Sequence, residues 1–200
     1  MQRPTKEQIQ ALPIYEGVKF GNIAVVTNQY QAVRVLNKLK QTSCLGFDTE
    51  SKPCFKKGQS SDGPHLIQLA TESKAYLFPT QFHFNVCIVK EILTDPAIKK
   101  VGFGLNEDKK LLCRKYGIRL ANPEELSSKV MKFAQLKDRV GARVAVAMLL
   151  KKRLAKSAQR SNWAKFPLDK HQIKYAANDA HAALILELEI ERVKSLGGQL

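Results

Sequence analysis

Two carboxylates close an apolar segment early in the chain. The segment Cys44-Leu45-Gly46-Phe47-Asp48-Thr49-Glu50 places its acids at positions i and i+2. Alternate side chains of a β-strand point to the same face, so a strand here would put Asp48 and Glu50 side by side. Two neighbouring acids raise each other's pKa, and a divalent cation can neutralise them. The pair therefore indicates a metal site, although a strand with a solvated end can also finish in Asp-x-Glu.

Two later stretches could present further acids from helices. Asp108 lies near the start of a predicted helix that follows Gly102-Phe103-Gly104, where the helix dipole by itself favours an acid. Tyr175 and Asp179 are spaced i, i+4 and share one helix face. The alanines between them would let that face approach a sheet closely. Taken singly, these patterns are typical of a first-turn acid and a surface pair, so any shared chemistry requires that the stretches meet in space.

The first half of the chain has mainly strand patterns, with one helix. Its short turns predict an antiparallel meander, and hence a mixed sheet. The expected elements are a strand pair or hairpin over 18–26 around Gly21-Asn22, a helix to Lys40 capped by Thr27 or Asn28, the acid-bearing strand, an exposed loop over 51–63, and strands over 66–70 and 75–78.

Helical periodicity dominates the second half. The expected elements are a helix interrupted at Asp95-Pro96, a short strand over 100–104, a helix from Asn106 or Glu107 to Tyr116, helical segments from Asn122-Pro123 onward broken by Gly141, and a final helix from Lys170 to Leu196 that Asp169 caps and Gly197-Gly198 ends. Strands followed by helices, with alternation between them, predict an α/β or α+β layered fold.

Charge is the most informative part of the composition. Lys and Arg number 33 against 18 Asp and Glu, which gives a formal net charge of +15 over 200 residues. This excess favours a polyanionic partner, which could be DNA, RNA, an anionic membrane or an acidic protein, and nucleic acid is the commonest of these. No apolar run is long enough for a membrane span, and the first residues do not resemble a secretory signal. Four scattered cysteines predict reduced thiols rather than a zinc or redox site. We expect a cytoplasmic protein, or a nuclear one if the source is eukaryotic.

In chain order, the acid-bearing stretches resemble the three motifs of the DEDD superfamily of 3′→5′ exonucleases, tyrosine subtype. The matching stretches are 47–50 (FDTE), 101–108 (VGFGLNED) and 175–180 (YAANDA), with support from 66–70 (LIQLA), 160–163 (RSNW) and 167–168 (PL). The resemblance is closest to ribonuclease D and Werner-type exonuclease domains, and it covers roughly residues 18–193. One departure is Gly104, which stands where proofreading polymerases have Asn. This difference favours the Werner-like branch over a proofreading role.

The resemblance implies a ribonuclease H-like α/β fold, a central mixed sheet flanked by helices, over residues 18–196. Residues 1–17 would then be an N-terminal extension and 197–200 a C-terminal tail. It also implies two Mg²⁺ or Mn²⁺ ions, which suit hard carboxylate ligands. Their ligands would be Asp48, bridging both ions, with Glu50 and Asp179 at the water-activating ion and Asp108 at the other. Tyr175 would orient the attacking water, and 5′-mononucleotides would leave the 3′ end of DNA, RNA or both.

Substrate binding must bring a single-stranded 3′ end to these acids. Residues 151–165 contain six cations and no acid, and they could track phosphates or could simply be a solvated basic surface. Lys152 and Arg160 are the candidates from this run, and the backbone of Thr49 could approach the terminal nucleotide. Trp163 could stack on a base or pack in the core.

Two other functions remain open. One is a catalytically inactive nucleic-acid-binding module that keeps the fold and the basic surface, and the other is a basic scaffold that recruits an acidic protein. The presence of all four acids and the tyrosine favours the enzyme. The sequence does not distinguish ribose from deoxyribose.

Overall fold

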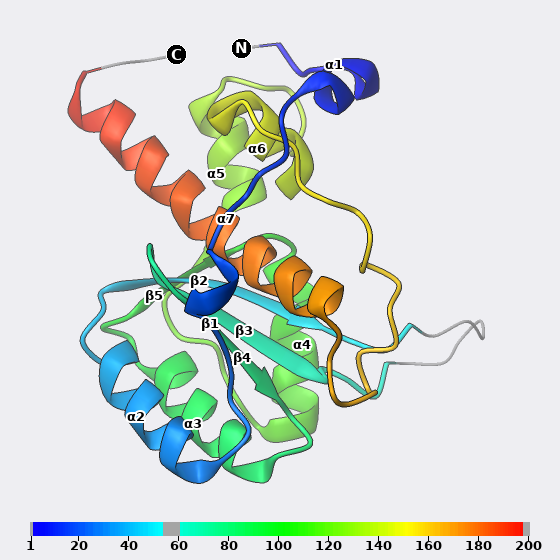
Figure 1. The fold of residues 1–200 in the computed structure, drawn as a ribbon. Coiled ribbons are helices and arrows are strands. Elements are labelled where there is room, and N and C mark those ends of the chain that lie inside the picture. The colour runs from blue at the N-terminus through cyan, green and yellow to red at the C-terminus, as the bar shows by residue number, and fades with distance from the viewer. Residues whose placement is uncertain (1, 54–60, 198–200) are drawn as a thin grey trace.

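A six-stranded mixed sheet forms the centre of the molecule (Figure 1). The computed structural model describes residues 2–53 and 61–197. In spatial order the strands are β1 (Ile23–Val25), β4 (Ala75–Pro79), β3 (Leu66–Ala70), β2 (Cys44–Glu50), β5 (Lys99–Gly102) and β6 (Pro123–Glu125). The strands β2, β3 and β4 form the predicted antiparallel meander, and the other pairs are parallel. The mixed sheet is therefore confirmed.

Helices cover both faces of the sheet, as the α/β prediction requires. The helices are α1 (Lys6–Ala11), α2 (Gln29–Leu39), α3 (His83–Thr94), α4 (Leu105–Tyr116), α5 (Leu126–Phe133), α6 (Ala142–Leu150) and α7 (Lys170–Ser195). One core layer joins α2, α3 and α4 to the sheet. The long α7 packs on the opposite face, with α5 and α6 beside it (Figure 1). The sheet is thus buried on both sides.

Alternation along β2 decides which of its residues meet which layer. Leu45 and Phe47 are fully buried in the layer formed with α2 and α3. The residues between and after them face α7, so Gly46, Asp48 and Glu50 lie on the α7 side. The strand thus buries one set of side chains and presents the acids with the other.

The predicted helix boundaries are largely confirmed, and side-chain caps explain them. The Asn28 side chain accepts from the backbone N–H of Gln31 at the start of α2. At the start of α7, Asp169 and Gln172 form a reciprocal capping box. Gly197 follows α7 with a φ of 69°, which glycine adopts at little cost. Gly198 lies outside the described residues.

Two expected elements are corrected. The hairpin over 18–26 is wrong, because Phe20–Asn22 forms a short 3₁₀ turn, closed by the Asn22 N–H on the Lys19 carbonyl, and only β1 follows it. The helical pattern from Asn122 also begins too early, because Pro123–Glu125 forms β6. This strand has no β-branched or aromatic residue, and it exists because its backbone pairs with β5 at the sheet edge. Its proline stands at the first position, where a strand tolerates it.

Residues 13–15 of the N-terminal segment contact the rest of the domain. Ile14 bridges to Arg153, and the Tyr15 hydroxyl lies 2.7 Å from His181 Nδ1. His181 Nε2 lies 2.9 Å from the Glu72 carbonyl. A carbonyl can only accept, so Nε2 carries the proton and Nδ1 accepts from Tyr15. His181 is therefore structural.

Two other expectations concern the whole chain. Cys44, Cys87 and Cys113 are free thiols, while Cys54 lies outside the described residues, as does 54–60 of the predicted loop. No helix among the described residues is long and apolar enough to span a bilayer.

Candidate active site

Three of the four predicted acids meet at one point between β2 and α7. Each of Asp48, Glu50 and Asp179 offers one carboxylate oxygen, and these oxygens all lie within 4.8 Å of one another. Asp48 and Glu50 come from the end of β2 and Asp179 from the third turn of α7. Oxygens this close can share a cation, so the structure joins two stretches that are far apart in the sequence.

A glycine allows the two elements to approach so closely. A Cβ on Gly46 would lie only 1.9 Å from the Ala180 carbonyl oxygen and 3.1 Å from the Leu184 side chain. Gly46 precedes Asp48 by two residues on the same face, and Ala180 directly follows Asp179. Because Gly46 has no side chain, the backbones of β2 and α7 pack directly against each other. This backbone contact sets the separation of the acids on the two elements.

Asp108 reaches the site from the opposite layer. It lies in the first turn of α4, with only 8% of its surface exposed. Thr49, which alternates with the two β2 acids, donates its hydroxyl to Asp108 Oδ1. Burial raises the pKa of Asp108 to about 6, against the opposing effect of this hydrogen bond. Thr49 thus connects Asp108 to the strand that carries Asp48 and Glu50.

Burial and mutual repulsion raise the pKa values of the clustered acids. Burial raises the pKa of Glu50 to about 9, and the charges of Asp179 and Asp108 add to the effect. Burial and the same neighbouring carboxylates hold the pKa of Asp48 well above its usual range. Burial raises the pKa of Asp179 to about 6, while Tyr175 and Arg143 oppose the increase. Among the ion pairs of the described residues, none involves the three clustered acids.

This donor set fits a divalent cation. Carboxylate oxygens are the ligands that Mg²⁺ and Mn²⁺ prefer. A bound cation would also remove the repulsion that raises the acids' pKa values. Asp48, Glu50 and Asp179 are the residues that would hold it, with Asp108 close enough for its charge to act on Glu50.

Tyr175 lies one helical turn before Asp179, with 8% of its surface exposed. Burial raises the pKa of its hydroxyl, and the charges of Asp179 and Glu50 raise it further. The hydroxyl therefore keeps its proton and can donate a hydrogen bond. Trp163 packs against it, with the ring centroids 6.1 Å apart.

The base-stacking interpretation of Trp163 is corrected by its burial. Only 2% of its surface is exposed, and it belongs to the core beneath α7. Its aromatic face is covered by protein, so the ring supports Tyr175 instead of a base. Lys152 and Arg160 are exposed, and neither lines the cavity that holds the acids.

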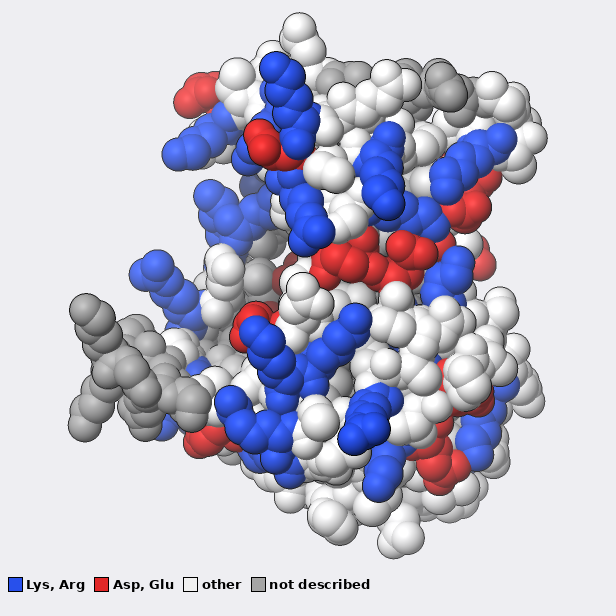
Figure 2. All heavy atoms as spheres, turned by 180° about the vertical axis from the view of Figure 1, so that it is seen from behind, with Lys and Arg blue, Asp and Glu red and all other residues white. Residues whose placement is uncertain are grey.

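The acids line an open cavity of about 540 Å³. Its wall includes two polar residues that sequence reasoning missed, Arg143 at the start of α6 and Gln159 in the segment after it. Arg143 Nη2 donates to Gln159 Oε1 at 2.8 Å. The only sequence signal for Arg143 is its place just after Gly141, where the helical pattern restarts. Figure 2 shows a face on which Lys and Arg side chains stand above and below a recess that contains acids.

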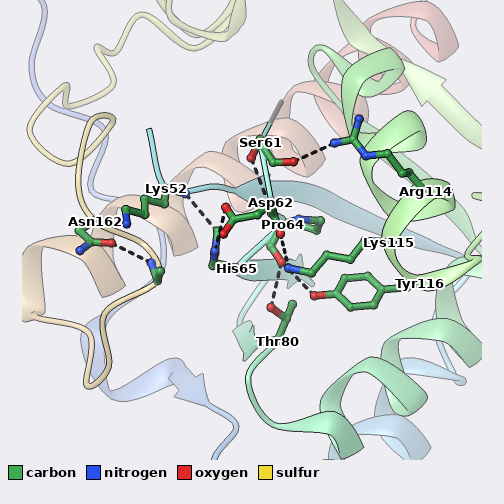
Figure 3. Close-up of polar contacts among 12 residues, drawn as sticks. Lys52, Ser61, Asp62, Pro64, His65, Thr80, Arg114, Lys115, Tyr116 and Asn162 are labelled. Carbon is green, nitrogen blue, oxygen red and sulfur yellow. Dashed lines mark hydrogen bonds and ion pairs between the residues drawn. The ribbon is translucent and has the colours of Figure 1, made fainter. Parts of the chain in front are cut away.

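The loop that leaves β2 is tied to the end of α4 (Figure 3). Arg114 Nη2 donates to the Ser61 carbonyl at 2.8 Å, and Lys115 donates to the Asp62 carbonyl. The His65 N–H, at the far end of the loop, donates to the Glu50 carbonyl at 2.8 Å. Arg114 and Lys115 therefore bind the protein's own backbone, in the loop that follows the strand end carrying Glu50.

Comparisons with known proteins agree with this geometry. A family model described as 3′-5′ exonuclease matches residues 23–193. The chain is 33% identical over 156 residues to the Mus musculus bifunctional 3′-5′ exonuclease/ATP-dependent helicase WRN, covering 74% of this chain and 11% of that protein. It is 28% identical over 159 residues to an Arabidopsis thaliana 3′-5′ exonuclease, covering 76% and 55%. The chain thus spans little more than half of one relative and about a tenth of the other.

A solved structure shows the same fold. The Nibbler EXO domain of Aedes aegypti superposes with a TM-score of 0.76 at 23% identity, covering 90% of this chain and 92% of that one. The ribonuclease H-like arrangement expected from the sequence is thereby confirmed. With the family model spanning nearly all of the domain, the chain belongs to the 3′→5′ exonuclease family of the DEDD superfamily, whose members are hydrolases that act on nucleic acids.

Proposed function

We propose that the chain is a metal-dependent 3′→5′ exonuclease that releases 5′-mononucleotides from single-stranded ends by a two-metal-ion mechanism. The observation that carries the proposal is the convergence of Asp48, Glu50 and Asp179 within 4.8 Å, on the wall of an open cavity. Mg²⁺ or Mn²⁺ ions bound there would activate water and stabilise the charge on the leaving 3′-oxygen. The family assignment supports the direction of attack.

The chain's own residues position the cations and the attacking water. Asp48, Glu50 and Asp179 bind and orient the cationic centre, and Asp108 adds a fourth carboxylate held by Thr49. Tyr175 keeps its proton because its pKa is raised, so it would orient the attacking water as a hydrogen-bond partner rather than act as a base.

Arg143 is a candidate for binding the scissile phosphate. It lines the same cavity as the acids, and its charge lowers the pKa of Asp179. A guanidinium there could neutralise a phosphate oxygen through paired hydrogen bonds. Its partner Gln159 is neutral and exposed, so the Arg143 charge is free to act on substrate.

The experiment compares cleavage of 5′-labelled single-stranded DNA and RNA of equal sequence in Mg²⁺, Mn²⁺ or EDTA. The test variant is Asp48→Asn, and the matched control is Asp138→Asn, because Asp138 is exposed and has no ion pair among the described residues. We expect a metal-dependent ladder that shortens from the 3′ end in the wild type and the control only. Whichever of the DNA and RNA substrates is shortened faster identifies the preferred sugar.

The alternatives give different results in the same assay. A catalytically inactive module would bind both oligonucleotides at low salt and shorten neither. A scaffold for an acidic protein would bind neither oligonucleotide. Shortening that persists in Asp48→Asn would place the chemistry elsewhere and contradict the proposed site.

A further inference from the structure

A second cavity lies beside the acid-lined one, between α1, α6 and the segment after α6. Its volume is about 600 Å³, and five cations stand on its wall. These are Arg3 and Lys6 from the N-terminal segment, Arg143 from α6, and Arg153 and Lys156 from the segment that follows it. No acid is among the described residues that line this cavity, so it concentrates positive charge.

The five cations lack carboxylate partners. Among the described residues, every ion pair within 4.0 Å involves other side chains. Arg3, Lys6 and Lys156 are exposed, while Arg143 and Arg153 are partly buried. Clustered cations without counter-charges repel one another, and a bound polyanion would relieve that repulsion.

The two cavities adjoin each other. Arg143, Val144 and Leu154 line both the basic cavity and the cavity that holds Asp48 and Asp179. Arg143 therefore stands at the junction between the acids and the remaining four cations. A chain of phosphates entering along the basic cavity would reach the acids without leaving the protein surface.

The N-terminal segment is fixed in place beside α6 (Figure 1). Arg153 is held by the chain around Ile14, since its backbone N–H donates to the Pro13 carbonyl and its Nε donates to the Leu12 carbonyl, both at 3.0 Å. The Tyr15 N–H donates to the Arg153 carbonyl at 2.8 Å. These bonds fix residues 12–15, which follow directly on the segment that carries Arg3 and Lys6.

We propose that this basic cavity binds the phosphates of the nucleotides upstream of the 3′ end, so that the N-terminal segment is part of the substrate path. The occupant is the backbone of a single-stranded nucleic acid, for which the unpaired cations supply charge and the aliphatic residues of the wall supply contact for sugars and bases. The inference rests on the proposed function, because the acids define where the 3′ end lies.

The test variant is Arg3→Gln with Lys6→Gln, which removes two charges from the distal wall and leaves the acids and Arg143 intact. The matched control is Lys38→Gln with Lys90→Gln, two exposed cations on α2 and α3 at the other face of the sheet. Binding of an oligonucleotide of about 20 residues is measured in EDTA over a range of salt. Cleavage of the same oligonucleotide and of a dinucleotide is measured in Mg²⁺.

Each neutralised phosphate of a single strand contributes a slope of about −0.7 to the plot of log K against log salt. We therefore expect the test variant to bind with a slope shallower by about 1.4, while the control keeps the wild-type slope. Cleavage of the long substrate should show a raised KM, and cleavage of the dinucleotide should be unchanged because it does not reach Arg3 and Lys6.

The outcomes separate the two proposals. If the wild type cleaves but the slope does not change, or if the control changes it equally, the basic cavity is not the substrate path. If the dinucleotide is affected as strongly as the long substrate, the two cations act on the fold instead of on upstream phosphates. If the wild type cleaves nothing while the slope still falls, the proposed function fails and the basic cavity remains a nucleic-acid-binding surface.

Discussion

Gly46→Ala tests the contact that brings the acids together. The new methyl group would lie 1.9 Å from the Ala180 carbonyl oxygen, whereas ordinary contact begins at 3.4 Å. The strand β2 and the helix α7 must therefore separate locally by about 1.5 Å. The Ala180 carbonyl is part of the helix backbone, so it cannot rotate away as a flexible side chain could.

This displacement sets the expected losses of stability and of cleavage rate. Forcing an extra methyl into a packed contact costs about 1–3 kcal/mol, and we expect the upper end because the contact is with backbone. For a chain of this size, about 3 kcal/mol corresponds to a melting temperature lower by roughly 6–12 °C. A misplacement of about 1 Å between catalytic groups costs roughly 100-fold in rate, and Asp48 and Asp179 flank the contact.

Thermal unfolding in EDTA and single-turnover cleavage in Mg²⁺ measure the two effects. Gly21→Ala is the matched control, because a Cβ there meets nothing within 4 Å and its φ is not in the left-handed region. We expect the control to match the wild type in both assays. A Gly46→Ala protein with the wild-type melting temperature and rate would refute the argument that this contact sets the acid geometry.

Three further predictions follow from individual groups. The pKa of Glu50 is raised from 4.5 to about 9 in the folded protein. Between these two pH values the folded state keeps a proton on Glu50 that the unfolded state has released. The stability of the metal-free protein therefore falls as pH rises through this window. The melting temperature in EDTA should fall from about pH 5 to pH 9, Mg²⁺ should restore more of it at high pH, and Glu50→Gln should flatten the slope; a rising curve would contradict the sign. Tyr175→Phe should lower the single-turnover rate by about 100-fold or more while the affinity for the oligonucleotide in EDTA stays unchanged, and an equal loss of both would make Tyr175 a structural residue. Tyr15→Phe should destabilise the fold by about 1–2 kcal/mol in urea unfolding, because it leaves the buried Nδ1 of His181 without its donor; wild-type stability would mean that this hydrogen bond does not anchor the N-terminal segment.

The sequence determined the elements whose patterns are local. The helix caps at Asn28 and Asp169, the meander and the strand that carries Asp48 and Glu50 all follow from side-chain type and spacing within a few residues. The alternation along that strand also assigned both acids to one face. Resemblance to a known family supplied the remaining site residues, because three short motifs in a fixed order are specific even where each is weak.

The strand β6 depended on a partner. Residues 123–125 have no strand propensity of their own, and only the exposed edge of β5 gives their backbone hydrogen bonds. The hairpin predicted over 18–26 failed for the converse reason. Val18 packs in the core layer with α7, and Phe20–Asn22 forms a 3₁₀ turn in place of the first strand.

Only the tertiary structure decided the surroundings of the acids. The ring of Trp163 is buried against Tyr175 because a core layer covers it. The cations Arg3 and Arg143 line one cavity because a bridge at Ile14 holds the N-terminal segment beside α6. The bridge joins Ile14 to Arg153, more than a hundred positions away, and local propensity does not predict a contact over that separation. The sequence therefore determined which groups could do chemistry, and the packing of α7 and of the N-terminal segment decided which of them meet.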